Sequence, residues 1–363
     1  MDAKIIIVFH FTEWLWCFLH LFYYLCSQEY NINEKNDMID LKTQYAGLQL
    51  KSPIIVGSSG LTRNPNKSKE LEDAGAGAIV LKSLFEEQIE IQIDQVSKTS
   101  DYYPEAEDYL RSYMKQNQLQ EYLDLIKRTK EVCTVPVIAS INCYKSDAWI
   151  EFASEIEKAG ADALELNLFF VSTDIVHNGA VVRDLYIDVV KKVRKVVTIP
   201  FTVKISQNVG NVTALVNALK ANGADGFVLF NRYFQPDINL KKMELIPGSI
   251  FSRPEELYET LRWTAIVSGK LPNVSLAASR GIHGWEGVAK CILMGANAVQ
   301  MCSAIYQSGT RIISESLEGL SKWMEEQNFQ NLGQFRGLLN SAKFPNPTIY
   351  ERHQFMKYYS NRE

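Results

Sequence analysis

The sequence lacks the spacings with which cysteine and histidine usually bind metals. Its six cysteines include no Cys-x-x-Cys pair, and its five histidines include no His-x-x-x-His pair. Most of the cysteines lie in apolar runs, which favours buried, reduced thiols over disulfides or a zinc site. The sequence therefore predicts neither a metal centre nor an iron–sulfur cluster.

Charge and composition exclude further classes. Acidic residues outnumber basic ones by 42 to 38, and no Lys- or Arg-rich arm is present. This balance gives no electrostatic support for nucleic-acid binding. A Gly-x-Gly-x-x-Gly segment for a separate dinucleotide-binding domain is also missing. The 363 residues, 46% of them hydrophobic, suffice for one large core, and we expect a small molecule as the substrate.

Residues 5–26 form an apolar run unlike the rest of the chain. The run is about as long as a membrane span, but Glu13 lies well inside it and would be costly in lipid. It could be a membrane anchor, an amphipathic surface helix, or an extension outside the working protein, and the polar connector 27–37 favours the last. We predict an extension over 1–37, a folded domain over 38–345 and a tail over 346–363. A cytoplasmic location is expected, with membrane association through the apolar run as the alternative.

From Met38 onward, short apolar runs alternate with helical patterns. Continuously apolar strands are typical of a parallel sheet that is buried on both faces. The predicted strands cover residues 53–57, 78–83, 135–141, 163–168, 199–205, 226–231, 275–279 and 298–302. The predicted helices cover residues 67–74, 119–132, 147–159, 180–196, 212–222, 254–269, 284–294 and 309–327.

Four predicted helices end in a Gly-Ala step that leads into the next strand. Gly75, Gly160, Gly223 and Gly295 occupy these steps, and glycine is the preferred residue just after a helix. Eight strand–helix units in roughly 265 residues indicate a (β/α)8 barrel, the TIM barrel, in the α/β class. An open doubly wound sheet is the alternative.

Polar side chains follow several of the predicted strands. In (β/α)8 barrels, the active site lies at the C-terminal ends of the strands. Lysines and asparagines stand at five of these ends: Lys82, Asn142, Asn167, Lys204 and Asn231. Such a set suits a planar, electron-accepting ring, because a lysine ammonium beside a flavin stabilises negative charge on the reduced ring.

The segment 275–304 combines a strand, a glycine turn, a helix and a second strand. Small residues at its two turns, among them Gly281 and Ser303, allow main-chain N–H groups to approach a phosphate closely. An ordinary strand–helix–strand crossover with a glycine turn is the alternative. The segment thus favours a ligand that carries a phosphate.

From Met38 to Leu339, the sequence resembles the dihydroorotate dehydrogenase family. The resemblance implies a TIM barrel that uses FMN to oxidise dihydroorotate to orotate in pyrimidine biosynthesis. It rests on short segments in the same order and spacing: Ser52-Pro53-Ile54-Ile55 with Ser58-Ser59-Gly60, Leu81-Lys82-Ser83, Glu165-Leu166-Asn167-Leu168, Val203-Lys204-Ile205, Leu261-Arg262-Trp263, Arg280-Gly281-Ile282 and Gly295-Ala296-Asn297-Ala298-Val299-Gln300.

The resemblance also implies a role for each matching position. Lys204 would lie near the pyrimidine end of the flavin ring, and Gly281 would bind its phosphate. Asn167 and Asn231 would bind the substrate. The full set of implied FMN contacts is Ser59, Gly60, Lys82, Ser83, Asn142, Asn167, Lys204, Ser252, Gly281, Cys302 and Ser303.

The sequence departs from the family where the catalytic base is expected. The position that carries Cys or a nearby Ser in the family is Phe170 here, which cannot accept a proton, and the expected substrate-binding Asn is Ser172. The candidate bases are Ser172, Thr173 and Asp174, of which position favours Ser172, and Lys82 is predicted as the second catalytic residue. A loop that merely covers the flavin is the alternative for Ser172.

The sequence also departs from the family at positions that are expected to bind the substrate. The region 99–106 is acidic and aromatic where the family carries a substrate loop, and Asn231 is followed by Arg232, which could be an anion anchor or a salt-bridged rim residue. Two alternative functions stay open: an FMN enzyme that acts on a neutral, flat substrate, and a barrel that binds a phosphorylated ligand without catalysis.

The electron acceptor and the assembly are less constrained. Fumarate, a quinone and a partner flavoprotein all remain candidates for the acceptor. Soluble members of the family that the chain resembles are often dimers, so a homodimer is compatible with the resemblance. The stretch 101–113 is interpreted as a lid over the site or an oligomer contact.

Overall fold

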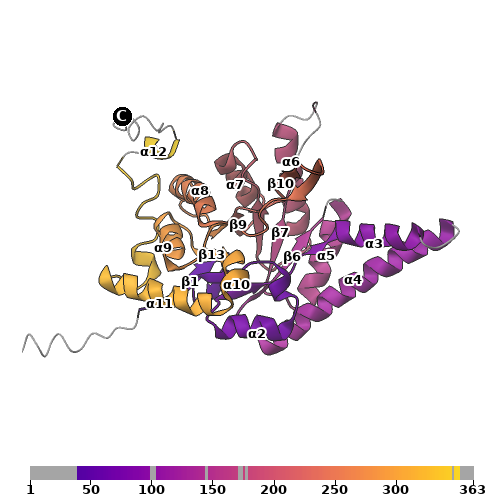
Figure 1. The fold of residues 1–363 in the computed structure, drawn as a ribbon, viewed down its shortest axis with the longest axis horizontal. Coiled ribbons are helices and arrows are strands. Elements are labelled where there is room, and N and C mark those ends of the chain that lie inside the picture. Colours follow the sequence, from indigo (N-terminus) through magenta and orange to yellow (C-terminus); the bar gives the residue numbers. More distant parts are fainter. Residues whose placement is uncertain are drawn as a thin grey trace, which may run out of the picture. The chain divides into compact units, whose positions relative to one another are not determined.

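The computed structural model describes residues 39–98, 104–143, 146–170, 175, 179–345 and 347–351. Residues from Asp40 onward form one compact unit, which is drawn in Figure 1. The apolar run 5–26, the connector 27–37 and Ser172 lie outside the described residues, so the predictions that concern them stay predictions. In the described part of the chain, no helix has both the length and the apolar character needed to cross a membrane.

Eight parallel strands of the described chain close into a barrel, which confirms the predicted fold class. Strand β3 (Ile54–Val56) pairs with β4 (Ala78–Val80) on one side and with β13 (Ala298–Met301) on the other. The direct pairing of β4 with β6 (Val137–Asn142) closes the ring. The remaining strands are β7 (Ala163–Asn167), β8 (Phe201–Ile205), β9 (Gly226–Leu229) and β12 (Leu276–Ser279).

Helices follow the strands and surround the barrel (Figure 1). Their apolar residues recur at helical spacing: α6 (Gly179–Arg194) buries Tyr186, Val189, Val190 and Val193 on one face. The other helices at predicted positions are α2 (Pro65–Asp73), α4 (Pro104–Val132), α5 (Ser146–Lys158), α7 (Val212–Ala221), α8 (Leu257–Lys270), α9 (Trp285–Leu293) and α11 (Arg311–Glu326).

Glycine ends four helices in the way the sequence predicts. Gly75, Gly160, Gly223 and Gly295 have φ angles of 109°, 90°, 110° and 109°. Side chains with a Cβ atom rarely adopt this conformation, so glycine reverses the chain there at little cost. Each reversal returns the chain to the start of the next barrel strand.

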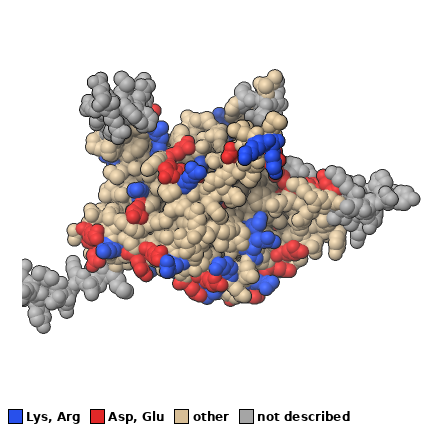
Figure 2. Space-filling view, viewed as in Figure 1, with Lys and Arg blue, Asp and Glu red and all other residues tan. Residues whose placement is uncertain are grey.

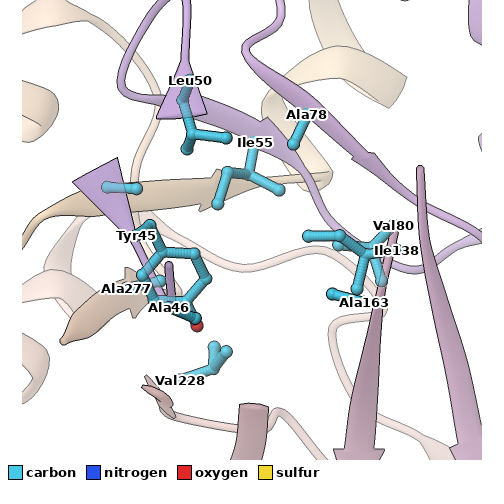
Figure 3. Packing of buried hydrophobic residues seen from close by; sticks show 11 residues of the cluster. Tyr45, Ala46, Leu50, Ile55, Ala78, Val80, Ile138, Ala163, Val228 and Ala277 are labelled. Atoms are coloured by element: carbon cyan, nitrogen blue, oxygen red, sulfur yellow. The ribbon is translucent and has the colours of Figure 1, made fainter. Parts of the chain in front are cut away.

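A short hairpin covers the end of the barrel where the strands begin. Strands β1 (Thr43–Tyr45) and β2 (Leu48–Leu50) pair with each other, and the buried Tyr45 hydroxyl donates to the Phe227 carbonyl at 3.4 Å. Figure 3 shows Tyr45 among small side chains such as Ala277, which leave room for its ring. This apolar plug leaves the opposite, C-terminal end of the barrel for the site.

Two hairpins interrupt the barrel pattern and were not predicted. Helix α3 (Glu86–Lys98) follows the two-residue strand β5 (Leu84–Phe85) and packs against α4, so that both helices project sideways from the barrel (Figure 1). Helix α4 begins at Pro104, well before the predicted start at residue 119, so residues 104–113 are helical. Residues 104–113 of the stretch interpreted as a lid or an oligomer contact thus belong to α4, and both roles stay predictions.

The second hairpin joins β9 to α8. Strands β10 (Pro236–Asn239) and β11 (Glu244–Pro247) pair only with each other, and their side chains are mostly exposed. Exposed strands of four residues carry no alternating apolar pattern, which is why sequence periodicity misses them.

The two signs of charge are mixed on the surface. Figure 2 shows basic and acidic residues interspersed over the face in view. Several are neighbours in ion pairs, such as Lys69 with Asp73 at 2.6 Å and Lys115 with Glu151 at 2.6 Å. Exposed pairs of this kind contribute little to stability.

Candidate functional site

A cavity of about 480 Å³ opens at the C-terminal ends of the barrel strands. We call it the central cavity. Its walls come from residues within β8, from the last part of β12 and β13, and from the segments after β3, β9, β12 and β13, at the end of the barrel where such folds place their sites. Six of the predicted site residues line it: Lys204, Asn231, Ser252, Gly281, Cys302 and Ser303.

Lys204 is held in place from inside the barrel. Its Nζ atom donates to Gln300 Oε1 at 2.8 Å and lies 3.6 Å from Glu165 Oε1. Gln300 in turn donates its amide to the other Glu165 oxygen. Glu165 is 1% exposed, and its Oε1 atom has no hydrogen-bond partner among the described residues. The longer Lys204 contact is therefore an ion pair, and it fixes a cation at the floor of the cavity.

Two of the predicted asparagines meet beside this lysine. The Asn231 amide donates to Asn167 Oδ1 at 2.8 Å, and Asn167 lies opposite Lys204 in the register of β7 and β8. Beyond the bond that they share, the pair has one further donor group and one further acceptor group. Such a pair can recognise the N–H and C=O edge of a ring.

Hydrogen-bonded hydroxyls connect the ends of β3, β4 and β6 to helix α4. Ser58 Oγ lies 2.9 Å from Ser83 Oγ, which lies 2.7 Å from Ser140 Oγ. The Tyr122 hydroxyl donates to the Ser140 carbonyl at 2.9 Å and accepts from its N–H at 2.7 Å. Because these groups are buried or partly buried, the chain of bonds holds α4 firmly against the barrel.

The glycine turn after β12 has the shape of a phosphate cradle. Gly281 has a φ of 70°, and a Cβ atom there would lie 2.3 Å from the Leu257 nitrogen, so no other residue fits. Facing it, the Ser252 N–H donates to Ser303 Oγ at 3.0 Å, and Ser252 Oγ lies 3.2 Å from His283 Nε2. Hydroxyl and N–H donors beside a glycine, whose missing Cβ atom leaves the backbone accessible, fit a phosphate group.

Cys302 follows β13 and lines the central cavity, but it is not poised for chemistry. Burial raises the pKa of its thiol. The residue stays protonated at neutral pH, and its Sγ atom packs at the Cβ position that Gly57 leaves vacant. We assign it a packing role beside the predicted phosphate position.

Arg232 clamps the loop that forms one wall of the central cavity. It donates to the carbonyls of Ser249 and Ile250, each at 2.7 Å, and its Nε atom lies 3.2 Å from Glu256 Oε2. Of the two interpretations of Arg232, the structure thus shows the salt-bridged one.

A second arginine completes the cluster. Arg280 pairs with Glu256 Oε2 at 3.0 Å and also bonds Gln207. Burial alone would raise the pKa of Glu256, but hydrogen bonds from the Arg253 N–H and from both arginines outweigh burial and lower that pKa. Arg280 has a φ of 83°, which is rare for a residue with a side chain. The ion pairs hold it there, next to the glycine turn.

The two lysines predicted at strand ends, Lys82 and Lys204, line different cavities. Lys82 and Ser83 line a separate cavity of about 850 Å³, the hairpin cavity, between the barrel and the α3–α4 pair. Lys82 Nζ lies 5.3 Å from the centre of the Phe85 ring. Burial is the main cause that lowers the pKa of Lys82, and repulsion from Arg63 lowers it further. The bonded hydroxyls of Ser58 and Ser83 join the walls of the two cavities.

The remaining predicted residues lie close to these walls. Ser59 caps the short helix η1 (Gly60–Thr62), and Gly60 lies where a Cβ atom would meet the Tyr306 hydroxyl at 2.7 Å. Asn142 ends β6 and lies opposite Phe85 in the sheet. Ser172 is outside the described residues, so its assignment as the base stays a prediction.

Sequence reasoning did not assign the groups that hold the site. Glu165 and Glu256 hold residues that line the central cavity through ion pairs. Gln300 lines the central cavity and Tyr122 lines the hairpin cavity. One signal was available: a carboxylate inside an otherwise apolar strand, as in Ala163-Leu164-Glu165-Leu166, requires a buried partner. Among the described residues, no group of His, Cys, Asp and Glu could hold a metal ion.

A closed (β/α)8 barrel with a fixed lysine, an amide pair and a glycine turn around a cavity at its strand ends is an α/β barrel with a candidate ligand site in the usual place. The comparison with known families makes this more specific. A family model described as "Dihydroorotate dehydrogenase" matches residues 40–324. The chain belongs to the dihydroorotate dehydrogenase family.

Relatives with curated names match over most of their length. The catalytic subunit of dihydroorotate dehydrogenase B (NAD(+)) from Thermoplasma volcanium is 27% identical over 322 residues, which are 83% of this chain and 99% of that protein. The dihydropyrimidine dehydrogenase subunit PreA of Escherichia coli is 25% identical and covers 84% of this chain and 78% of its own. A putative dihydroorotate dehydrogenase A (fumarate) from Aeropyrum pernix is 28% identical and covers 84% and 98%.

Proposed function

We propose that this protein is an FMN-dependent oxidoreductase that acts on a carbon–carbon bond of a dihydropyrimidine ring, with dihydroorotate to orotate as the first candidate reaction. The names of its relatives support the ring class, since they specify dihydroorotate or dihydropyrimidine. The observation that carries the proposal is the central cavity, in which Lys204 is fixed beside the Asn167–Asn231 pair and the Gly281 turn.

The residues present fit FMN in a defined orientation. Gly281, Ser252 and Ser303 would hold the phosphate, and Lys204 would lie at the pyrimidine end of the ring. Bound FMN supplies a hydride acceptor. The chain contributes a fixed ammonium for the negative charge, and Asn167 and Asn231 to bind the substrate. The other proposed FMN contacts are Ser59, Gly60, Lys82, Ser83, Asn142 and Cys302.

Proton removal from the substrate is assigned to the loop after β7. Phe170 occupies the position expected for the base and packs edge-on against Tyr186, with ring centres 5.1 Å apart. A phenyl ring cannot accept a proton, so we propose Ser172 as the base. A serine needs an activating neighbour, and Lys82 is the proposed second catalytic group, because its lowered pKa makes it easier to deprotonate.

The first experiment is a visible spectrum of the purified protein, followed by anaerobic addition of dihydroorotate. Bound flavin that bleaches on addition supports the full proposal. A Ser172→Ala variant should then keep the flavin spectrum but bleach at least about tenfold more slowly, as expected for loss of a general base. Absence of flavin, even after reconstitution with FMN, would refute the cofactor assignment and leave a barrel that binds some other phosphorylated ligand.

A second candidate keeps FMN but changes the substrate. Phe170 favours it, because the aromatic residue replaces a polar one beside the predicted ring. A neutral ring such as dihydrouracil tests this idea in the same cuvette. Flavin that bleaches with dihydrouracil and persists with dihydroorotate would decide for the second candidate.

The electron acceptor is proposed to be a partner protein. Two of the relatives are named as subunits, and both names specify NAD, so those proteins work with other chains. A partner of this kind would copurify, or would restore turnover when it is added to protein whose flavin is already reduced. Fumarate and quinones are the competing acceptors, and a homodimer stays a prediction.

A further inference from the structure

The hairpin cavity is not used by the proposed reaction except through Lys82 and Ser83 at its edge. It measures about 850 Å³ and lies between η1 and α2 on one side and helices α3 and α4 on the other. Most of its lining comes from the helical hairpin and not from barrel strands. Its chemistry therefore belongs to this insertion and can be considered on its own.

Three of the residues that line this cavity are cations: Arg63, Lys82 and Arg128. Among the described residues, no ion pair involves Arg63, Lys82 or Arg128, although all three contribute to the wall. Arg63 lies close enough to Lys82 to lower its pKa. Like charges that approach one another without a carboxylate between them raise the free energy of the folded state. An anion bound between them would remove that cost.

The carboxylates in the same wall are already engaged. Glu121 accepts from the Asn117 amide at 3.0 Å, and Asp124 accepts from the Gln120 amide at 2.8 Å, both along α4. Each bond joins residues one helical turn apart on the exposed surface of that helix. With three cations against two carboxylates, the cavity keeps a net positive charge.

The walls of the cavity are fixed relative to the barrel. Tyr122 ties α4 to Ser140 through both backbone groups of that residue. Across the hairpin, the Gln118 amide bonds Gln92, so α3 and α4 are also joined to each other. A pocket with anchored walls loses little entropy when a ligand binds. The uncompensated cations therefore belong to a preformed site.

We propose that the hairpin cavity binds a small anion of the phosphate or carboxylate class between Arg63 and Arg128, with Lys82 as its third contact. Arginine is suited to both groups, because its planar guanidinium donates two parallel hydrogen bonds to their oxygens. The site does not depend on the proposed function. Because Ser83 borders it and bonds Ser58 of the central cavity, a bound anion would lie next to the cofactor position.

The test is isothermal titration calorimetry on the full chain after incubation with excess FMN, so that phosphate cannot occupy the cofactor's own cradle. Inorganic phosphate and succinate are the two probes. Binding of phosphate only, succinate only, or both would support the site and identify the class of its natural ligand. Arg63→Gln and Arg128→Gln should each weaken binding about fivefold, as expected for loss of one exposed charge contact.

Arg183→Gln is the matched control, because Arg183 is exposed on α6 and already paired with Asp184 at 2.9 Å. It should leave the affinity unchanged. All variants should keep the melting temperature of the parent protein, which shows that they fold. Absence of heat with either probe at 10 millimolar, on the order of the weakest useful affinity, would overturn the proposal. Equal weakening by Arg183→Gln would do the same.

Discussion

Replacing Glu256 with glutamine should reveal how much the arginine cluster contributes to the protein. Glu256 is the shared partner of Arg232 and Arg280, and Arg232 holds three carbonyls of the loop 249–251. Glutamine keeps the size and one acceptor oxygen but removes the charge. Both guanidinium groups would then remain partly buried without a counter-ion.

The expected cost follows from their exposure. The side chains of Arg280, Glu256 and Arg232 are 9%, 18% and 19% exposed. Breaking a fully buried ion pair costs about 3–5 kcal/mol, whereas an exposed pair contributes about 0–1 kcal/mol. These side chains lie nearer the buried limit, so Glu256→Gln should lower the free energy of unfolding by about 2–3 kcal/mol.

Urea unfolding at pH 7 measures this change. The control is Glu315→Gln, because Arg311 and Glu315 also form an arginine–glutamate ion pair, but at 81% and 48% exposure. It should cost less than about 0.5 kcal/mol. If both variants lose the same small amount, the cluster does not clamp the loop and the reasoning fails.

The difference in stability between the parent protein and Glu256→Gln should depend on pH in a defined way. The folded pKa of Glu256 lies below its usual value of 4.5. A lowered folded pKa means that the stabilising contribution is present above pH 4.5 and is lost as the pH falls through the folded value. The gap between the parent protein and Glu256→Gln should therefore be constant near neutrality and shrink below pH 4.5. A gap that widens in acid would contradict the assignment.

Three further substitutions test other parts of the site. Gly281→Ala forces a Cβ atom against the backbone at the start of α8 and should cost more than about 1 kcal/mol, with loss of FMN affinity in a fluorescence titration. Tyr122→Phe removes both bonds to Ser140 and should cost about 1–3 kcal/mol; hydrogen exchange should accelerate in α4 and stay unchanged elsewhere. Lys204→Met leaves Glu165 buried without its cation and should lower stability by about 3–5 kcal/mol, which thermal melting would detect and which an unchanged melting temperature would disprove.

The barrel could be predicted from the sequence because its signals are local and repeated. Apolar runs of strand length and the glycine steps before four strands identify the strand–helix units, and the ends of those strands identify Lys204, Asn167 and Asn231 as neighbours. Side-chain period and glycine conformation are properties of short segments, so they can be read without knowing the fold.

The two hairpins could not be predicted in this way. Most of the described side chains of α3 are exposed or half-buried, and its sequence is rich in Glu and Gln, so it carries no strong apolar signal. The sequence places Lys82 and Lys204 both at strand ends, but it does not show that Lys82 also lines a separate cavity. Which cavity a strand-end side chain faces depends on the insertion that follows it, and that is a tertiary property.

The ion-pair cluster shows the same limit. Glu256 and Arg280 are separated by more than twenty positions and carry no spacing signal, yet they meet beside the glycine turn. Only the position of Arg280 next to Gly281 connects it to the motif. Partners that act over long sequence distances become visible only when the barrel brings their loops to one end.

The direct pairing of β4 with β6 makes the α3–α4 hairpin an exchangeable part. Ring closure is completed by the bonds of Ile79 and Val80 with Val137 and Ile138, and the intervening insertion takes no part in those bonds. Lengthening, shortening or swapping the insertion would leave the barrel's closure intact while replacing one whole wall beside Lys82. Evolution or a protein engineer could thereby change which molecules reach this side of the barrel without rebuilding the scaffold.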